Sequence, residues 1–368
     1  MKKPNFFSLA IALFAVLFAA VPCFSASLSA ESAILIEADS GAVIAEKNAH
    51  KRLPMASTTK IMTAVVAIEK LPADRQVKIP SAACGVEGSS VYLVPGETLT
   101  VEELLYAMLL ESANDAAAAI AIETAGSLGA FADLMNAKAA ELGLGDTHFT
   151  NPHGLYDEEH YTTAADLAKL TAYALGNETF AKIVSTYKHT IPLHGDEGVR
   201  VLINHNRLMK MSDDVIGVKT GFTKKSGRCL VSAAERDGVR VIAVTLNAPD
   251  DWNDHLAMLE KGLSSYASYA LAETGQYTLD IPAVGTDDGM LTVTNKDALR
   301  VTLPAGKEIT AAVEAPHILL TPVKEGDPVG RVVFTENGEE IASLELTACE
   351  TSEAEKPGLI KKILGLFR

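Results

Sequence analysis

Residues 55–64, Met-Ala-Ser-Thr-Thr-Lys-Ile-Met-Thr-Ala, constrain the fold and chemistry of this chain more than any other stretch. Pro54 precedes them, and residues 65–70 are apolar enough to form a buried helix. Ser57 is therefore expected near a helix N-terminus, with Lys60 one turn later on the same face. Unpaired N–H groups and the helix dipole favour negative charge there. A desolvated lysine loses its proton easily, so the stretch indicates Ser57 as a nucleophile and Lys60 as its base.

The Ser-x-x-Lys spacing is not decisive by itself, because residues 185–188 repeat it. That second copy runs into residues 189–192, which indicate a strand and a stop at Pro192 rather than a helix start. On spacing alone, a serine such as Ser57 is more often an ordinary N-cap than a nucleophile. Other polar positions in the chain must decide between the two interpretations.

The N-terminus has the pattern of a secretory signal peptide. Two lysines lie within the first three of the 368 residues, and an unbroken apolar run follows over residues 6–21. We expect a signal peptide over residues 1–25, cleaved close to Ser25. A lipoprotein modified at Cys23 and an uncleaved membrane anchor are the alternatives.

The charge of the chain argues against nucleic-acid binding. The formal net charge is −15, and removing Lys2 and Lys3 with the signal peptide takes it to −17. A body this acidic, without a basic stripe, is a poor partner for a phosphate backbone, so no nucleic acid is expected. The four cysteines form no Cys-x-x-Cys pair, and a disulfide framework is not expected.

An α/β (α+β) domain is expected over residues 30–273. Strands at residues 33–38 and 42–47 would form a hairpin, and core helices would follow. Two strong strands, joined by the turn dipeptide Asp237-Gly238, would precede a long helix over residues 251–273. This order of elements predicts an antiparallel sheet with helices on its faces.

A break between two apolar helices places further polar side chains in the interior. Residues 111–115 contain Ser112 and Asn114, and an alanine-rich helix follows at once. Polar side chains at such a break either cap a helix or point into a cavity. The histidines of the loop at residues 146–161 lack the spacing of metal ligands, so neither a metal nor a cofactor is expected.

These positions together resemble a known enzyme family. Ser57-x-x-Lys60, Ser112-x-Asn114 and Lys219-Thr220-Gly221 follow the order of the motif trio of penicillin-recognising serine enzymes. Residues 89–98, 151–155, 160–163 and 219–223 resemble D-alanyl-D-alanine carboxypeptidases, the low-molecular-mass penicillin-binding proteins. The resemblance implies a β-lactamase/transpeptidase-like domain.

The resemblance also implies a role for each residue. Ser57 would attack the peptide bond, Lys60 would take its proton, and Ser112 would relay a proton to the leaving nitrogen. Substrate binding would fall to Asn114, Lys219, Thr220, Gly221, Phe222 and Thr223. Backbone N–H groups at Ser57 and near Phe222 would form the oxyanion hole. Lys219 acting with Ser112 stays open as the alternative base.

The expected reaction is removal of the terminal D-alanine from peptidoglycan stem peptides, with β-lactam antibiotics as competing acylating agents. A catalytically weak wall-scaffolding protein and a β-lactamase are the alternatives. Some family members carry an arginine beyond the last strand that assists carboxylate binding, but residues 248–255 contain none. Carboxylate recognition would then rest on Lys219, Thr220 and Thr223, or on a residue that the pattern does not identify.

The sequence pattern changes in the C-terminal part of the chain. Short alternating strands separated by turns predict a small all-β domain over residues 275–349, and residues 350–357 form a polar linker. Residues 358–368 are expected to form an amphipathic helix with cations on one side, too short to span a bilayer. We expect it to hold the exported protein at the outer face of the cytoplasmic membrane, and packing on the β domain is the alternative.

Overall fold

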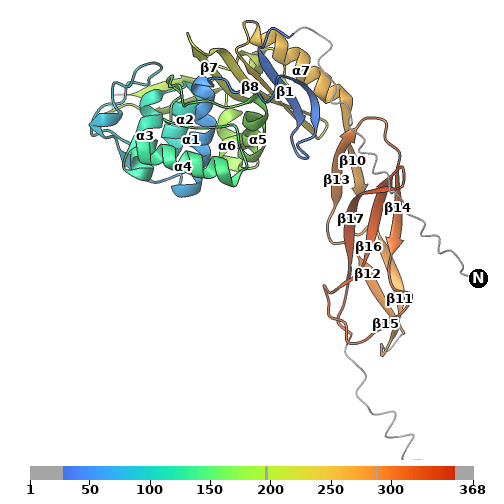
Figure 1. Ribbon diagram of the computed structural model, residues 1–368. Coiled ribbons are helices and arrows are strands. Elements are labelled where there is room, and N and C mark those ends of the chain that lie inside the picture. Colours follow the sequence, from blue (N-terminus) through green and yellow to red (C-terminus); the bar gives the residue numbers. More distant parts are fainter. Residues whose placement is uncertain (1–27, 195–197, 287–288, 353–368) are drawn as a thin grey trace, which may run out of the picture.

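The computed structural model describes residues 28–194, 198–286 and 289–352. Within these residues the chain forms an α+β domain and an elongated all-β domain, with α7 beside their junction (Figure 1). The expected signal peptide, the end of the linker and the amphipathic tail at residues 358–368 lie outside the described residues.

A five-stranded sheet lies at the centre of the first domain, and every neighbouring pair in it is antiparallel. In spatial order the strands are β2 (Val43–Lys47), β1 (Ser32–Glu37), β9 (Val239–Leu246), β8 (Gly227–Arg236) and β7 (Val215–Thr223). The middle strands are apolar on both faces because helices cover both. Strand β7 is an edge strand, so its outer side is free to meet a substrate.

The helices divide between the two faces of the sheet (Figure 1). One face packs on the N-terminal helices and the other on α7 (Asp251–Ser265). The helices of the first face are α1 (Lys60–Lys70), α2 (Val101–Leu110), α3 (Asn114–Ala125), α4 (Leu128–Glu141), α5 (Ala164–Leu175) and α6 (Glu178–Val184). Among the described residues no single helix is long and apolar enough to cross a membrane, although the α3–α4 pair, bent by 82°, passes that test together.

Two small hairpins complete the domain. They are formed by β3 (Gln76–Lys78) with β4 (Thr98–Thr100), and by β5 (Lys188–Pro192) with β6 (Val199–Ile203). A capping box begins α2, as the Thr100-Val101-Glu102-Glu103 sequence predicts, since the side chains of Thr100 and Glu103 each accept the other's backbone N–H. The predicted fold class is confirmed by this architecture.

The expected long helix over residues 251–273 is wrong in its last part, after residue 265. Helix α7 ends at Ser265, and Tyr266–Ala272 is strand β10, which pairs with β13 (Leu299–Pro304). Ser265 ends the helix with its hydroxyl on the carbonyl of Lys261, 2.5 Å away. The segment that follows is rich in tyrosine and alternates in character, and the partner strand then decides its conformation.

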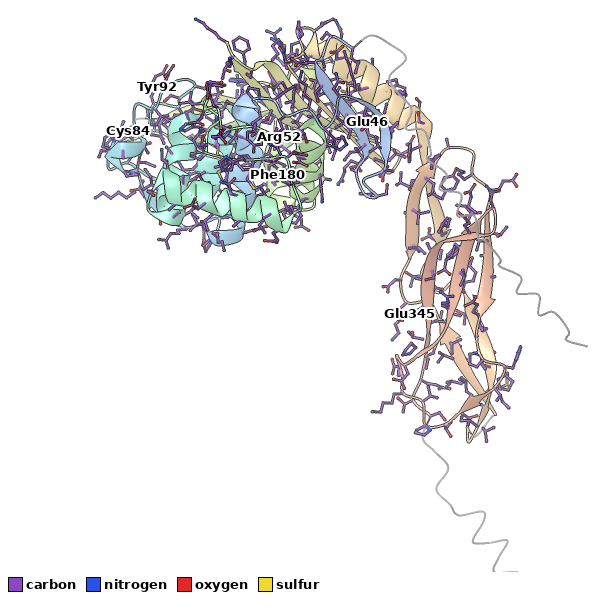
Figure 2. All side chains as sticks on the ribbon, viewed as in Figure 1. Glu46, Arg52, Cys84, Tyr92, Phe180 and Glu345 are labelled. Atoms are coloured by element: carbon purple, nitrogen blue, oxygen red, sulfur yellow. The ribbon has the colours of Figure 1, made fainter. Side chains whose placement is uncertain are left out.

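The all-β domain contains short strands separated by turns, as the sequence predicts, and strand β10 joins it from before the expected boundary at residue 275. Its larger sheet has the order β14-β16-β17-β12-β11-β15 around a core that includes Phe334. The strands are β11 (Thr278–Val284), β12 (Met290–Thr294), β14 (Ile309–Glu314), β15 (Leu319–Leu320), β16 (Pro328–Glu336) and β17 (Glu339–Ala348). Figure 2 shows side chains along the whole length of this domain.

Candidate active site

Ser57 and Lys60 meet at the start of α1. Ser57 lies in the 3-10 turn Ala56–Thr59, and Lys60 is the first residue of the helix. The lysine side chain is fully buried, and its Nζ lies 3.1 Å from Ser57 Oγ. The same Nζ donates to Asn114 Oδ1 and to the carbonyl of His153, each at 2.7 Å.

These three contacts match a neutral lysine. A neutral amine has two N–H donors and one lone pair. The amide oxygen of Asn114 and the carbonyl of His153 accept only, so they take the two N–H groups. The lone pair is then left for the hydroxyl of Ser57, which is the arrangement of a general base and its nucleophile.

The surroundings also favour the neutral form. Burial lowers the pKa of Lys60 well below its ordinary value of 10.5, and the charge of Lys219 lowers it further, whereas Asp115 opposes the shift. Burial likewise lowers the pKa of Lys219 to about 7, against the opposing charge of Glu111. Lys219 can therefore change protonation near neutral pH, and burial favours the neutral form of Lys60.

Ser112 and Asn114 occupy the break between α2 and α3. Ser112 has a positive φ of 60°, a conformation that turns the chain sharply between the two helices. Asn114 joins two parts of the site, because its Oδ1 accepts from Lys60 and its Nδ2 donates to the carbonyl of Glu87 at 2.5 Å. Its backbone N–H donates to the carbonyl of Ser89 at 2.7 Å, so this break also anchors the loop around residues 87–89.

The strand that carries Lys219 passes directly beside the nucleophile. A Cβ on Gly221 would lie 3.1 Å from the backbone nitrogen of Ser57, so only glycine allows this approach without displacement. The Nζ of Lys219 donates to the carbonyl of Thr220 at 3.0 Å. Phe222 follows with 65% of its surface exposed. The backbone of β7 at Gly221 therefore lies beside the backbone nitrogen of Ser57, where the oxyanion hole is expected.

Thr223 is placed differently from the other predicted residues. Its Oγ1 bonds Ser226 Oγ at 2.8 Å in the turn between β7 and β8, and it is not among the side chains that line the cleft. This leaves Thr220 as the predicted hydroxyl that faces the cleft from β7.

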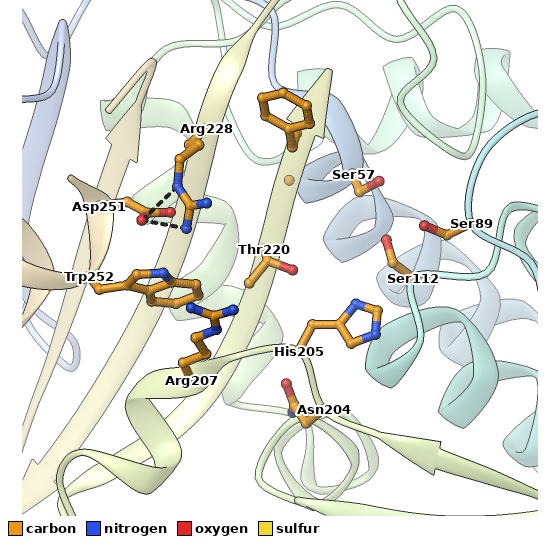
Figure 3. A pocket seen from close by; sticks show the side chains of 12 residues that line it. Ser57, Ser89, Ser112, Asn204, His205, Arg207, Thr220, Arg228, Asp251 and Trp252 are labelled. Carbon is orange, nitrogen blue, oxygen red and sulfur yellow. Dashed lines mark hydrogen bonds and ion pairs between the residues drawn. The ribbon is translucent and has the colours of Figure 1, made fainter. Parts of the chain in front are cut away.

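A cleft of about 540 Å³ opens between β7 and the helices (Figure 3). Ser57, Ser112 and Thr220 face it from three separate elements, whereas Lys60, Asn114 and Lys219 are buried behind its wall. The lining residues are Ser57, Ser89, Ser112, Asn204, His205, Arg207, Thr220, Gly221, Phe222, Arg228, Asp251 and Trp252.

Sequence reasoning missed the support that the loop at residues 146–161 gives to the site. The carbonyl of His153 holds Lys60, and Gly154 packs so tightly that a Cβ would lie 1.9 Å from the carbonyl oxygen of Ala56. His160 bonds the hydroxyl of Thr59 at 2.7 Å. Burial lowers the pKa of His160 to about 4 and that of His153 to about 3, so both are neutral supports. Among the described residues, no three His, Cys, Asp or Glu side chains are placed to hold a metal ion.

The second Ser-x-x-Lys copy has no comparable surroundings. Ser185 caps the C-terminal end of α6, where its hydroxyl donates to the carbonyl of Lys182 at 3.1 Å. Lys188 lies exposed on β5. Ser185 therefore has neither a helix N-terminus nor a buried lysine beside it.

Comparisons with known proteins agree with this geometry. The profile of peptidase family S11, described as D-alanyl-D-alanine carboxypeptidase, matches residues 19–250. D-alanyl-D-alanine carboxypeptidase DacF of Bacillus subtilis (strain 168) is 33% identical over 90% of this chain and 87% of its own length. DacC of Escherichia coli (strain K12) is 32% identical over 89% and 85%. The structure of penicillin binding protein 5 from Haemophilus influenzae superimposes with a TM-score of 0.68, at 27% identity, over 89% of this chain and 98% of that one.

Proposed function

The chain belongs to peptidase family S11, the D-alanyl-D-alanine carboxypeptidases, and on that premise we propose that it removes the terminal D-alanine from peptidoglycan stem peptides. The observation that carries the proposal is the contact of a buried Lys60 with Ser57, in which both lysine N–H groups are held by acceptors. This contact is what a serine peptidase needs to form its nucleophile without a histidine.

The reaction proceeds through an acyl-enzyme. Lys60 takes the hydroxyl proton as Ser57 Oγ attacks the carbonyl carbon of the penultimate D-alanine. The N–H groups of Ser57 and Phe222 stabilise the oxyanion. The tetrahedral intermediate collapses and the peptide bond breaks, and the nitrogen of the terminal D-alanine takes, through Ser112, the proton that Lys60 accepted. Lys60 is then neutral again and takes a proton from a water molecule as that water attacks the ester. The same proton passes to Ser57 Oγ when the ester bond breaks, which restores the free enzyme.

The choice between the two lysines as base rests on their positions. The Nζ of Lys60 reaches Ser57 Oγ directly, whereas that of Lys219 is bonded to its own strand at Thr220. We therefore assign proton abstraction from Ser57 to Lys60. Lys219 supplies positive potential beside the reacting groups. A β-lactam acylates the same serine because its strained amide presents the same carbonyl to the same groups.

The direct test is release of D-alanine from a synthetic peptide ending in D-Ala-D-Ala. The purified protein should release it, and should leave a peptide ending in D-Ala-L-Ala intact. Ser57→Ala should abolish release and keep the thermal unfolding midpoint, since this side chain contributes little packing. A wild-type protein that binds penicillin without releasing D-alanine would support the scaffolding alternative, and one that hydrolyses penicillin rapidly would support a β-lactamase.

The proposed site of action is the outer face of the cytoplasmic membrane. The support is the sequence alone: a basic, apolar N-terminus suited to export, and six large apolar residues of the tail on one arc of a helical wheel. Lys361, Lys362 and Arg368 fall on the other arc, where they can meet anionic lipid. In this arrangement the tail holds the enzyme beside its substrate.

A further inference from the structure

An apolar patch lies on the outer face of the β domain, where β11 and β15 form one edge of the larger sheet. Parallel pairing sets Val284 directly opposite Leu320. Pro282, two residues before Val284, is exposed on the same face of β11, whereas Ala283 between them is buried. Ile318, just before β15, is exposed as well. Pro282, Val284, Ile318 and Leu320 are named the tip patch.

The exposure of these side chains is more than the fold requires. Leu320 is 72% exposed, more than any other aliphatic side chain in the described chain, and Val284 and Ile318 are each 55% exposed. Scattered exposed aliphatic residues are ordinary, but neighbours from two strands form a contiguous surface of the kind that partners cover. The sheet beneath is closed by a separate small core around Leu291 and Val323, so folding does not need the patch.

The described chain ends beside the tip patch. Ser352 pairs with Val323 through backbone hydrogen bonds of 2.7 and 3.0 Å, and Val323 lies three residues after Leu320. Figure 1 shows β11 and β15 at the end of the β domain that lies away from the first domain. Residues 353–368 therefore continue the chain from this end.

The sequence after Ser352 is long enough to return to the patch. The linker at residues 353–357 spans at most about 18 Å when extended, and the three residues from Leu320 to Val323 span about 10 Å. A helix over residues 358–368 would be about 16 Å long. Strands lie about 4.8 Å apart, so β11, β15 and the loop before β15 present a surface of roughly 10–15 Å. The apolar arc of the tail therefore fits the tip patch in reach and in length.

Charge favours the tail of the chain over an anionic lipid as the occupant. Acidic residues outnumber basic ones around the patch in the described chain, and Asp280 shares the outer face of β11 with Val284. Such a rim repels an anionic surface and attracts cations. On a helical wheel Lys362 and Arg368 flank the two edges of the apolar arc, where they can meet this rim. The other charged residues around the patch are Glu325, Asp327 and Glu350, with Lys296 and Lys324 of opposite sign.

We propose that the tail, residues 358–368, docks its apolar arc on the tip patch of the same chain and leaves the patch when it enters a lipid surface. Docking and lipid insertion need the same arc, so a tail cannot do both at once. The tip patch keeps the arc out of water before the protein meets the membrane, and the affinity of the tail for lipid is reduced in proportion to its undocked fraction. The arc consists of Leu359, Ile360, Ile363, Leu364, Leu366 and Phe367.

The test measures trypsin cleavage after Lys361 and Lys362 in the mature chain without lipid, for the wild type, Leu320→Glu and Val313→Glu. Val313 is the matched control, because it is aliphatic, 45% exposed and lies on β14, the opposite edge of the same sheet. Docking protects the tail, so Leu320→Glu should speed its cleavage about tenfold or more, and Val313→Glu should match the wild type. Cleavage after Lys324, exposed in the turn after β15, should keep its rate, since its acceleration would report local unfolding.

A second measurement leaves the tip patch unchanged and decides the matter if cleavage after Lys324 also rises. Methyl NMR signals of Val284 and Leu320 should differ between the mature chain and a chain ending at Glu355, whereas those of Val313 should coincide. Phosphatidylglycerol bicelles should move the first two signals of the mature chain to their positions in the shortened chain. Leu320→Glu should bind phosphatidylglycerol vesicles more tightly than the wild type, because no docked state competes.

The outcomes that would overturn the proposal are distinct. Methyl signals of Val284 and Leu320 that ignore removal of the tail would exclude docking, as would wild-type tail cleavage in Leu320→Glu. Protection that grows with protein concentration would assign the tip patch to the tail of a second copy. Weaker vesicle binding by Leu320→Glu would assign it to lipid. None of these measurements uses D-alanine release, so the proposal and the proposed function fail separately.

Discussion

Asn114→Asp puts the neutral state of Lys60 to a direct test, since it replaces an amide oxygen by a carboxylate of nearly the same shape. The amide oxygen lies 2.7 Å from Lys60 Nζ, and Asn114 is only 4% exposed. A carboxylate there stabilises the ammonium form and raises the pKa of Lys60. Because the base works only when deprotonated, the rising limb of the pH–rate profile should move to higher pH.

The size of the shift can be bounded from the geometry. Two unit charges 4 Å apart interact by about 4 kcal/mol at an effective dielectric constant of 20, and these two atoms are closer still. Desolvation of the new carboxylate offsets part of this, and an opposite charge at such a distance usually shifts a pKa by about one to three units. Each unit corresponds to about 1.36 kcal/mol, or a factor of ten. Acylation at a pH on the rising limb should therefore slow by about tenfold to a thousandfold.

The assay is the second-order rate of acylation by a fluorescent penicillin, measured between about pH 5 and pH 10 with the unfolding midpoint recorded at each pH. Asn136→Asp is the matched control, because Asn136 also anchors the site loop, through two 2.8 Å bonds to the backbone of Phe149. That variant should lose stability, but the rising limb of its pH–rate profile should stay at the wild-type pH. An Asn114→Asp protein with the wild-type pH profile would refute a neutral Lys60 as the base.

Three further predictions concern the base, its support and the tail. Lys60→Arg cannot lose its proton in this pH range and should show no acylation at any pH, and an active variant would move the base role to Lys219 with Ser112. Gly154→Ala, at φ +87°, should lose at least about 1–3 kcal/mol of unfolding free energy and most of its acylation rate, because the new Cβ would meet the carbonyl of Ala56. Gly41→Ala, at φ +71° with no atom within 4 Å, should show the backbone strain alone and keep its acylation rate. A chain ending at Glu355 should remain active on a small peptide but fail to sediment with anionic vesicles, and sedimentation equal to that of the full mature chain would exclude the tail as the anchor.

The sequence predicted the elements that carry strong local patterns. The helix behind Ser57, the capping box at Thr100 and the Asp237-Gly238 hairpin all follow from apolar periodicity or turn chemistry. The family resemblance predicted which motifs meet, and the comparisons confirm the family. The geometry brings Ser57, Lys60, Ser112, Asn114 and the β7 residues up to Phe222 to one cleft, although roles within it stay predictions.

The features that sequence reasoning missed depend on contacts between distant segments. Nothing near His153 shows that its carbonyl will hold Lys60, 93 residues away. The sequence of β10 was predicted as a continuation of the helix. Its extended conformation depends on pairing with β13, which local sequence does not show. Arg207 belongs to none of the motifs identified in the sequence. Its place on the cleft wall depends on the hydrogen bonds of Asn204 and Asn206, which hold the turn after β6.

The most direct test of the central claim is to find which side chain penicillin acylates. The intact protein should be treated with labelled penicillin, digested, and the labelled peptide sequenced by mass spectrometry. We predict one adduct per chain, on Ser57, because among the serines that the structure describes only this one combines a helix start with a buried lysine 3.1 Å from its hydroxyl. A label on Ser185 or any other residue, or no label at all under conditions where the protein is folded, would contradict the account.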